Sequence, residues 1–192
     1  SQPCFAQGPR AQARQTSASA LSAQEAADLA FMREEEKLAR DLYVSLNDYW
    51  NRMVFANISA SEETHFSTLG DALARYNLAD PALSGAGMFS NGELQALYDA
   101  LLNQGRGSLV AAFRTGALVE EVDIEDLDAA LASTSHADLQ TIYTRLQCGS
   151  GNHLRAFVRN LETAGVAYEA QVLPQERVDA ILAAPMGRCG GM

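Results

Sequence analysis

A glutamate and a histidine, Glu62 and His65, stand three residues apart in a segment with helical periodicity. Three residues are close to one helical turn, so both side chains leave the same face of a helix. That face also carries apolar residues, namely Val54, Ile58, Leu69, Ala72 and Tyr76. The carboxylate and the imidazole therefore point towards the core. A Glu-x-x-His pair inside a helical bundle is half of a site for two metal ions, whose other half must come from other helices.

The composition predicts one folded domain with an acidic surface. The chain has 192 residues, of which 47% are hydrophobic, and this is enough for one sizeable core. With 14 basic and 24 acidic residues, its formal charge is -10. Such a charge disfavours nucleic acids and anionic membrane surfaces as partners and leaves cations as ligands. No apolar run approaches the roughly 18 residues that span a bilayer, so we expect no membrane partner.

The two ends differ from the middle of the chain. Residues 1–20 are rich in Ala, Gln, Ser and Arg without apolar periodicity, which predicts a flexible tail. We expect a helical domain over residues 21–184 and a Gly-rich tail over residues 185–192. A start at Ser1 fits the removal of an export signal and equally a chain shortened in another way. Localisation stays open, with an exported or periplasmic location favoured over a cytoplasmic one.

The three cysteines, Cys4, Cys148 and Cys189, have no metal-ligand spacing. Two readings remain open. A Cys4–Cys189 disulfide would tie the termini together in an oxidising compartment, whereas free thiols are the simpler alternative.

The apolar pattern predicts an all-α fold. Long helices are expected at residues 22–50, 54–76, 109–133 and 137–164, and short ones at residues 91–105 and after Pro174. Ser22 and Glu25 have the spacing of a capping box at the start of the first helix. Short links make the long helices two antiparallel hairpins, and a connection of about 30 residues lets the second and third long helices run parallel. No segment sustains the apolar alternation of a strand.

The third and fourth long helices also place polar residues among apolar ones. Glu120 lies within the apolar arc of its helix, and Asp123 lies at the edge of that arc, as an additional ligand or an outer-shell acceptor. Glu121 and Glu125 are expected to point to solvent. The fourth helix directs His153 and Ser150 inward, so it offers Ser-x-x-His in place of a second Glu-x-x-His.

The first helix leaves a choice among three adjacent carboxylates. Helical rotation places Glu34 outside the apolar arc, Glu35 near its centre and Glu36 towards one edge. Tyr43, two turns after Glu36, lies almost beneath it and is able to hydrogen-bond a nearby carboxylate. The rotational pattern alone favours Glu35.

Each of these features has an ordinary explanation taken alone. A charge run is usually a solvated face, an inward histidine is usually a hydrogen-bonded core residue, and Tyr43 is most simply a packing residue. Together, however, inward-facing Glu62, His65, Glu120 and His153 lie at corresponding depths of their helices. Uncompensated burial of several carboxylates costs several kcal/mol each. They therefore need a cation, partner residues or a water-filled cavity, and a shared metal centre would satisfy them together.

Two motifs carry a resemblance to known proteins. The string from Glu36 to Tyr43, EKLARDLY, followed by Glu62-x-x-His65 and inward Glu120 and His153, resembles the ferritin-like superfamily, which includes rubrerythrins and bacterioferritins. In those proteins the first-helix ligand commonly precedes a tyrosine by seven residues, and this selects Glu36 over Glu35. The strings FMREEEKLAR and NHLRAF resemble an uncharacterised ferritin-like family over roughly residues 22–184.

The resemblance implies a four-helix bundle that holds two iron ions, or manganese or other divalent ions, between its hairpins. The carboxylates of Glu36, Glu62 and Glu120 would bind or bridge the ions, and His65 and His153 would each supply one nitrogen. Tyr43 would serve as a hydrogen-bond partner or one-electron donor.

Ser150 departs from the superfamily pattern, because it stands where the second Glu-x-x-His motif has its glutamate. A symmetric six-ligand site is therefore not expected. Asp123 would compensate, or the second ion would be weakly held or absent, or the site would have lost its redox chemistry. The run from Gly149 to Gly151 would also distort the helix locally.

The expected function is that of a non-haem di-iron oxidoreductase, of the ferroxidase or peroxidase type, acting on ferrous iron, dioxygen or peroxide. A metal-binding or storage module without turnover is one alternative. A metal-free helical interaction domain is another. The oligomeric state stays open, a homo-oligomer included.

Overall fold

The computed structural model describes residues 19–190, and within them every regular element is an α-helix. The helices are α1 (Ala23–Trp50), α2 (Met53–Arg75), α3 (Gly92–Gly105), α4 (Leu109–Ser133), α5 (Ala137–Thr163) and α6 (Gln175–Ala183). No strand is present in this part of the chain. The predicted all-α class is confirmed.

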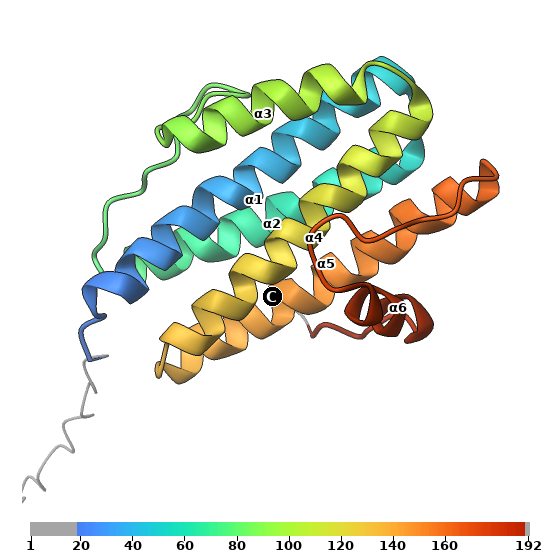
Figure 1. Cartoon of the computed structure of the whole chain (residues 1–192). Helices are drawn as coiled ribbons and strands as arrows, with labels where there is room; N and C mark the ends of the chain where they lie inside the picture. Colours follow the sequence, from blue (N-terminus) through green and yellow to red (C-terminus); the bar gives the residue numbers. More distant parts are fainter. Residues whose placement is uncertain (1–18, 191–192) are drawn as a thin grey trace, which may run out of the picture.

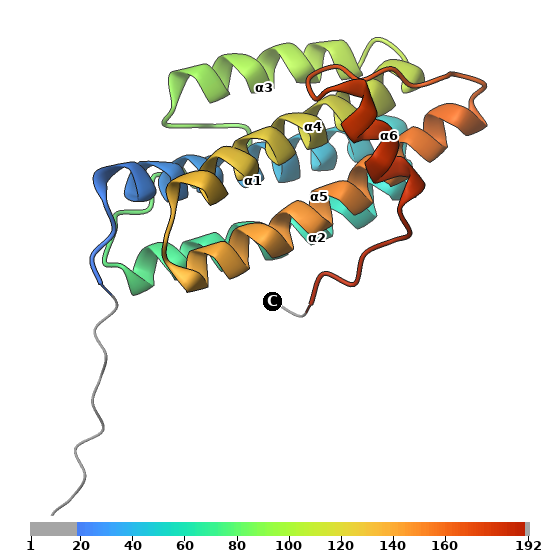
Figure 2. The same cartoon turned by 60° about the horizontal axis from the view of Figure 1, so that its bottom comes forward.

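The long helices form a bundle of two hairpins (Figure 1). Helix α1 packs along α2, and α4 packs along α5, while α1 also contacts α4 and α2 contacts α5. Helix α3 crosses the outer side of α1 and α4, and α6 packs against α5. Seen from a second direction, α3 lies above α1 and α4, which in turn lie above α2 and α5 (Figure 2). The crossover through α3 makes α4 run parallel to α2 (Figure 1).

Local sequence signals set the helix ends. The Ser22 side chain accepts a hydrogen bond from the Glu25 backbone N–H at 3.1 Å, and the Glu25 carboxylate accepts one from the Ser22 N–H at 2.8 Å. This is the predicted capping box. Asn51 ends α1 in the left-handed region, with φ of 49°, which lets α2 begin two residues later. Helix α5 continues as regular α-helix through Gly149 and Gly151, so the expected local distortion is absent.

Charged residues on the outer side of α1 are buried by the loop between α2 and α3. Glu34 accepts the backbone N–H of Ser90 at 2.7 Å. Lys37 is 1% exposed and forms an ion pair with Asp41 at 2.6 Å. The loop contributes three further backbone partners to this pair, Gly85, Gly87 and Met88. The charge run of α1 is therefore not a solvated face, because its charges bind loop backbone that would otherwise lack partners.

Glu121 on α4 was expected at the surface and is instead fully buried. The segment after α5 passes over it, and its carboxylate accepts the backbone N–H groups of Gln171, Val172 and Leu173. The Tyr168 hydroxyl donates to the same carboxylate at 2.5 Å. Glu125 is exposed, as expected.

The apolar core is divided into two clusters along the bundle. One cluster surrounds the end of α1 that contains Leu42 and Leu46, and the other surrounds the end that contains Leu29 and Met32. Buried polar residues lie between these clusters on the long helices. They are Glu35, Glu36, Glu62, His65, Glu120, Asp123, Ser150 and His153.

The disulfide differs from the predicted pairing. Cys189 is bonded to Cys148 on α5. The predicted Cys4–Cys189 bridge is therefore wrong, and so is the alternative that Cys148 and Cys189 are free thiols. The chain turns back onto α5 after α6, and this reversal brings the two cysteines together. Cys4 and most of the predicted tail over residues 1–20 lie outside the described residues. Within residues 19–190 no helix has the length and apolar character to cross a membrane.

Glu25 ties the start of α1 to the turn between α4 and α5. Its carboxylate accepts hydrogen bonds from the Thr134 hydroxyl at 2.7 Å and the Ser135 N–H at 3.2 Å, and it lies 2.7 Å from His136 Nδ1. The backbone N–H of Ser22, together with His136 and Thr134, lowers the pKa of Glu25 to about 2.

We expect Glu25→Gln to lower the free energy of unfolding at pH 6 by about 1–2 kcal/mol, because a neutral amide replaces a carboxylate in a buried network. The folded pKa of about 2 lies below the ordinary 4.5, so this stabilisation is present above pH 4.5 and is lost as the pH falls towards 2. Urea denaturation at pH 6 and pH 3 measures the difference. The exposed Glu162→Gln serves as the control, and a deficit of equal size at both pH values would contradict the assignment.

Candidate metal centre

Each long helix of the bundle contributes to a buried layer of carboxylates and imidazoles. Glu36 comes from α1, Glu62 and His65 from α2, Glu120 from α4 and His153 from α5. None of these residues is more than 7% exposed. The structure therefore brings together the five residues that helical periodicity and the tyrosine spacing had selected.

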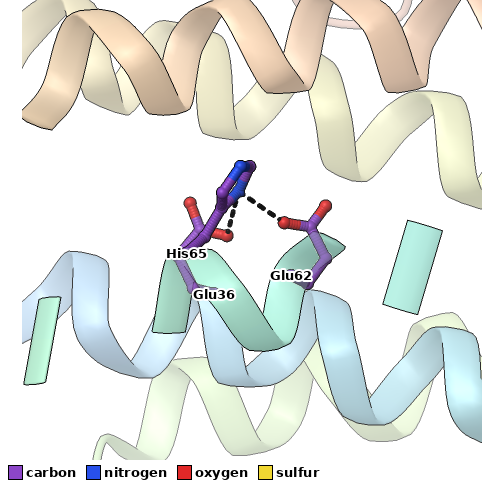
Figure 3. Close-up of side chains that lie close together, drawn as sticks. All are labelled: Glu36, Glu62 and His65. Carbon is purple, nitrogen blue, oxygen red and sulfur yellow. Dashed lines mark hydrogen bonds and ion pairs between the residues drawn. The ribbon is translucent and has the colours of Figure 1, made fainter. Parts of the chain in front are cut away.

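One half of the layer consists of Glu36, Glu62 and His65 (Figure 3). His65 Nδ1 lies 2.7 Å from Glu62 Oε2 and 3.2 Å from Glu36 Oε2. One atom from each of the three side chains lies within 4.8 Å of the others, which is close enough to share one metal ion. In Figure 3 the glutamates approach the imidazole from different helices.

The other half consists of Glu62, Glu120 and His153. His153 Nδ1 lies 2.8 Å from Glu62 Oε1 and 3.4 Å from Glu120 Oε2. The two imidazole rings lie face to face with centroids 5.6 Å apart. Glu62 thus directs one oxygen to each half, as a carboxylate that bridges two ions does.

Several buried oxygen and nitrogen atoms in and beside this layer have no hydrogen-bond partner. Buried and without a hydrogen-bond partner are Glu35 Oε2, Glu36 Oε1, Glu62 Oε2, Asp123 Oδ1 and His153 Nδ1. Buried polar atoms are normally satisfied, and those left unsatisfied point to a missing ion or water. Oxygen and imidazole donors in this number suit a divalent transition metal. The donor set therefore fits a metal centre.

The buried charges shift one another's pKa values in opposite directions. Burial raises the pKa of Glu62, but His153 and His65 more than offset this and hold it well below its usual range. Burial, Asp123 and Glu62 raise the pKa of Glu36. Burial alone would lower the pKa of His153, but the carboxylates of Glu62 and Glu120 have the larger effect and raise this pKa to about 10. The carboxylates thus attract positive charge into the layer, and metal ions would replace protons there.

Asp123 lies one turn after Glu120 and contacts the helix that lacks the second glutamate. The Ser150 hydroxyl donates to Asp123 Oδ2 and lies 3.0 Å from the Leu146 carbonyl oxygen. Burial and the charge of Glu120 raise the pKa of Asp123 to about 8. Its Oδ1 is buried and unpaired.

Glu35, the choice favoured by rotation alone, lies outside both three-residue groups. Burial, with Asp123 and Asp126 on α4, raises its pKa well above the usual range. The structure places Glu36, and not Glu35, beside Glu62 and His65.

Tyr43 lies beneath the layer as its spacing predicted. Its hydroxyl donates to Glu120 Oε1 at 2.6 Å, and its ring packs against Phe157 with centroids 5.2 Å apart. Burial and the neighbouring Glu120 raise the pKa of the phenol well above its usual range. The side chain is therefore a neutral donor to one carboxylate of the site.

Sequence reasoning missed the contributions of two small residues. A Cβ atom at Gly149 would lie 2.7 Å from both Cε1 and Nε2 of His65, so only glycine leaves room for the ring. The Ser61 hydroxyl lies 3.0 Å from His153 Nε2 and fixes the outer side of that imidazole. The only available signals were the position of Ser61 next to Glu62 and of Gly149 next to Ser150.

The protein is thus an all-helical bundle with a layer of carboxylates and histidines buried between its long helices. Residues 25–185 match the family described as an uncharacterized protein domain, DUF2202, and the chain belongs to this family.

A relative and its crystal structure extend the comparison. The uncharacterized protein MJ0754 of Methanocaldococcus jannaschii is 39% identical over 169 residues, which are 88% of this chain and 91% of that protein. The crystal structure of the hypothetical protein MJ0754 superposes with a TM-score of 0.85 at 35% identity, covering 96% of this chain and all of that one. The all-helical fold is therefore shared with an experimentally determined structure.

The contact between Gly149 and His65 predicts an unequal effect of two similar substitutions. We expect Gly149→Ala to lower the free energy of unfolding by about 1–3 kcal/mol relative to Gly151→Ala, because its new methyl group collides with the imidazole. At Gly151 the nearest atoms lie 3.7 Å and 3.8 Å from a Cβ, which is ordinary contact. Urea denaturation of both variants measures the difference, and equal stabilities would show that His65 moves aside freely.

Proposed function

We propose that this chain is a ferritin-like protein that binds two divalent metal ions, iron in the first place and manganese as the alternative. The observation that carries the proposal is the position of Glu62, which directs one oxygen to His65 and the other to His153. Two antiparallel hairpins joined by a long crossover, with the donors on facing helices, are the setting of di-metal carboxylate sites in ferritin-like bundles.

Each ion would be held by one imidazole and two carboxylates. Glu36, Glu62 and His65 would hold the first ion, and Glu62, Glu120 and His153 would hold the second. Three protein ligands leave positions open on each ion for a substrate. Two such ions supply redox chemistry with dioxygen, peroxide or ferrous iron, and this supports a ferroxidase or peroxidase activity.

The surrounding residues would orient the ligands and exclude bulk water. Tyr43 donates a hydrogen bond to Glu120, and Ser61 contacts the outer nitrogen of His153. The phenol of Tyr43 holds a proton 2.6 Å from Glu120 Oε1, measured between the oxygen atoms. The deep burial of the layer restricts substrates to ions and molecules of a few atoms.

Asp123 compensates for the glutamate that Ser150 replaces. The Ser150 hydroxyl holds one oxygen of Asp123, while the other stays unpaired and buried beside Glu120. Asp123 would thereby supply a carboxylate from α4 in place of one from α5, although it lies outside the two three-residue groups. The second ion would be held less symmetrically than the first.

Metal content tests the proposal directly. Protein purified without chelator and loaded with ferrous iron without oxygen should bind about two ions per chain, and Glu62→Gln should bind fewer than about one, because both ions lose their shared ligand. The matched control is Glu63→Gln, which changes the exposed neighbour on the same helix. Elemental analysis provides the measurement.

If wild-type protein binds no transition metal under any loading condition, the metal proposal fails. A metal-free interaction domain would then be the better account. In that case replacing Glu62 and His65 together with apolar residues would leave both the fold and the function unaffected.

Turnover distinguishes an enzyme from a storage module. We expect the iron-loaded chain to consume peroxide or dioxygen, and Tyr43→Phe to retain both ions while turning over about tenfold more slowly, because the proton donor at Glu120 is lost. Tyr98→Phe is the control, since this buried tyrosine bonds Ser45 instead of the metal layer. Peroxide and oxygen electrodes measure consumption. Two bound ions without consumption would favour the storage alternative.

A further inference from the structure

The disulfide lies on the side of α5 that faces away from the candidate metal centre. Cys148, on α5, is bonded to Cys189, 41 residues further along the chain and beyond α6. Both cysteines are partly exposed. Exposed disulfides are the ones that exchange with external thiols, whereas structural disulfides are usually sheltered.

Within the described residues, the segment that carries Cys189 lies on the surface of α5 and is joined to that helix by the disulfide and by side chains of α5. We call residues 184–190 the C-terminal strap; its residues 184–188 are exposed, and Met186 is 56% exposed. Asn152 of α5 donates to the Gly187 carbonyl at 3.1 Å and accepts from the Gly187 N–H at 2.8 Å, and Arg145 of α5 lies close to Gly190. The strap contributes no buried side chain to the core, so its release does not require the bundle to unfold.

A cavity lined by Cys148 lies beside the disulfide and is where an external thiol would enter. The cavity measures about 310 Å³ and lies between α4, α5, α6 and the strap. Cys148 and Gly187 line it, as do the guanidinium-bearing residues Arg155 and Arg177. Arg177 is ion-paired with Asp128, so Arg155 is left as a positive group beside the disulfide that favours a reductant carrying a carboxylate.

The other sulfur is placed to leave as a thiolate. The Asn152 side-chain N–H donates to Cys189 Sγ at 3.3 Å. Arg155 donates to the oxygen of the same amide at 2.8 Å, which orients it. A hydrogen-bond donor and nearby positive charge stabilise a thiolate and make it a better leaving group.

We propose that Cys148 and Cys189 form a site of reversible thiol–disulfide exchange, used by a small anionic thiol, that releases the C-terminal strap from α5. The thiolate of the reductant attacks Cys148 Sγ from the cavity, the bond between the two cysteine sulfurs breaks, and its electron pair leaves on Cys189. A second reductant thiolate attacks the reductant sulfur of the mixed disulfide and frees the Cys148 thiolate. Two thiolates are thereby oxidised to one disulfide as the protein disulfide is reduced. This inference goes beyond the proposed metal chemistry and does not depend on it.

The test uses the full chain with Cys4→Ser, so that only the exchanging pair is counted. The protein is treated with reduced glutathione under native conditions, and free thiols are alkylated with iodoacetamide. Mass spectrometry of the intact protein then counts the alkylated sulfurs. We expect both sulfurs to be alkylated while the circular dichroism stays that of the folded chain. Exchange of the Gly187 amide with deuterium should rise by at least about tenfold on reduction, because its hydrogen bond to Asn152 opens with the strap. Removing glutathione and adding its disulfide should restore the bond.

A double variant in the same background, Cys148→Ser with Cys189→Ser, is the control. It should show the fast Gly187 exchange of the reduced protein and the metal content of the parent chain. The proposal is overturned if the sulfurs become alkylated only in denaturant, or if reduction and unfolding coincide. It is equally overturned if the reduced strap keeps the slow exchange of the oxidised one. Alkylation and amide exchange report on the disulfide and the strap alone, so the two proposals fail separately.

Discussion

The carboxylate of Glu62 lies between two imidazoles that belong to different hairpins. His65 shares α2 with it, whereas His153 reaches it from α5. Charged groups buried this deeply are tolerated only when their partners are correctly placed, because an unpaired buried charge costs several kcal/mol. The contact therefore fixes how far α5 is displaced along α2. The rest of the bundle follows this register, since the apolar side chains above and below the polar layer form separate clusters.

The polar layer also explains what packs around it. A bulky side chain on α5 would displace His65, and glycine at position 149 avoids this. On the α4 side, the aromatic ring of Tyr43 closes the layer against the cluster that contains Phe157, and its hydroxyl reaches Glu120.

Much of this arrangement was predictable from the sequence because it depends on local rules. Capping by Ser22, the inward face of Glu120 and the inward position of His153 follow from residue type and helical rotation alone. The burial of Glu34 and Glu121 did not follow, because rotation describes a helix and not the loops that cross it. The carboxylate oxygens of Glu34 and Glu121 accept hydrogen bonds from backbone N–H groups about fifty residues away in the sequence. The partner of Cys189 was equally unpredictable, since it depends on where the chain reverses after α6.

The loop contacts have a mechanical consequence for the candidate metal centre. Glu34 and Glu36 project from different sides of α1, and Glu121 and Glu120 do the same on α4. Each helix is therefore held from behind by backbone hydrogen bonds while it presents a carboxylate in front. Twisting either helix about its own axis would displace the front carboxylate only at the cost of straining or breaking these rear hydrogen bonds. The hydrogen bonds from the crossing loops thus resist rotation of α1 and α4 and hold the carboxylates of Glu36 and Glu120 in position.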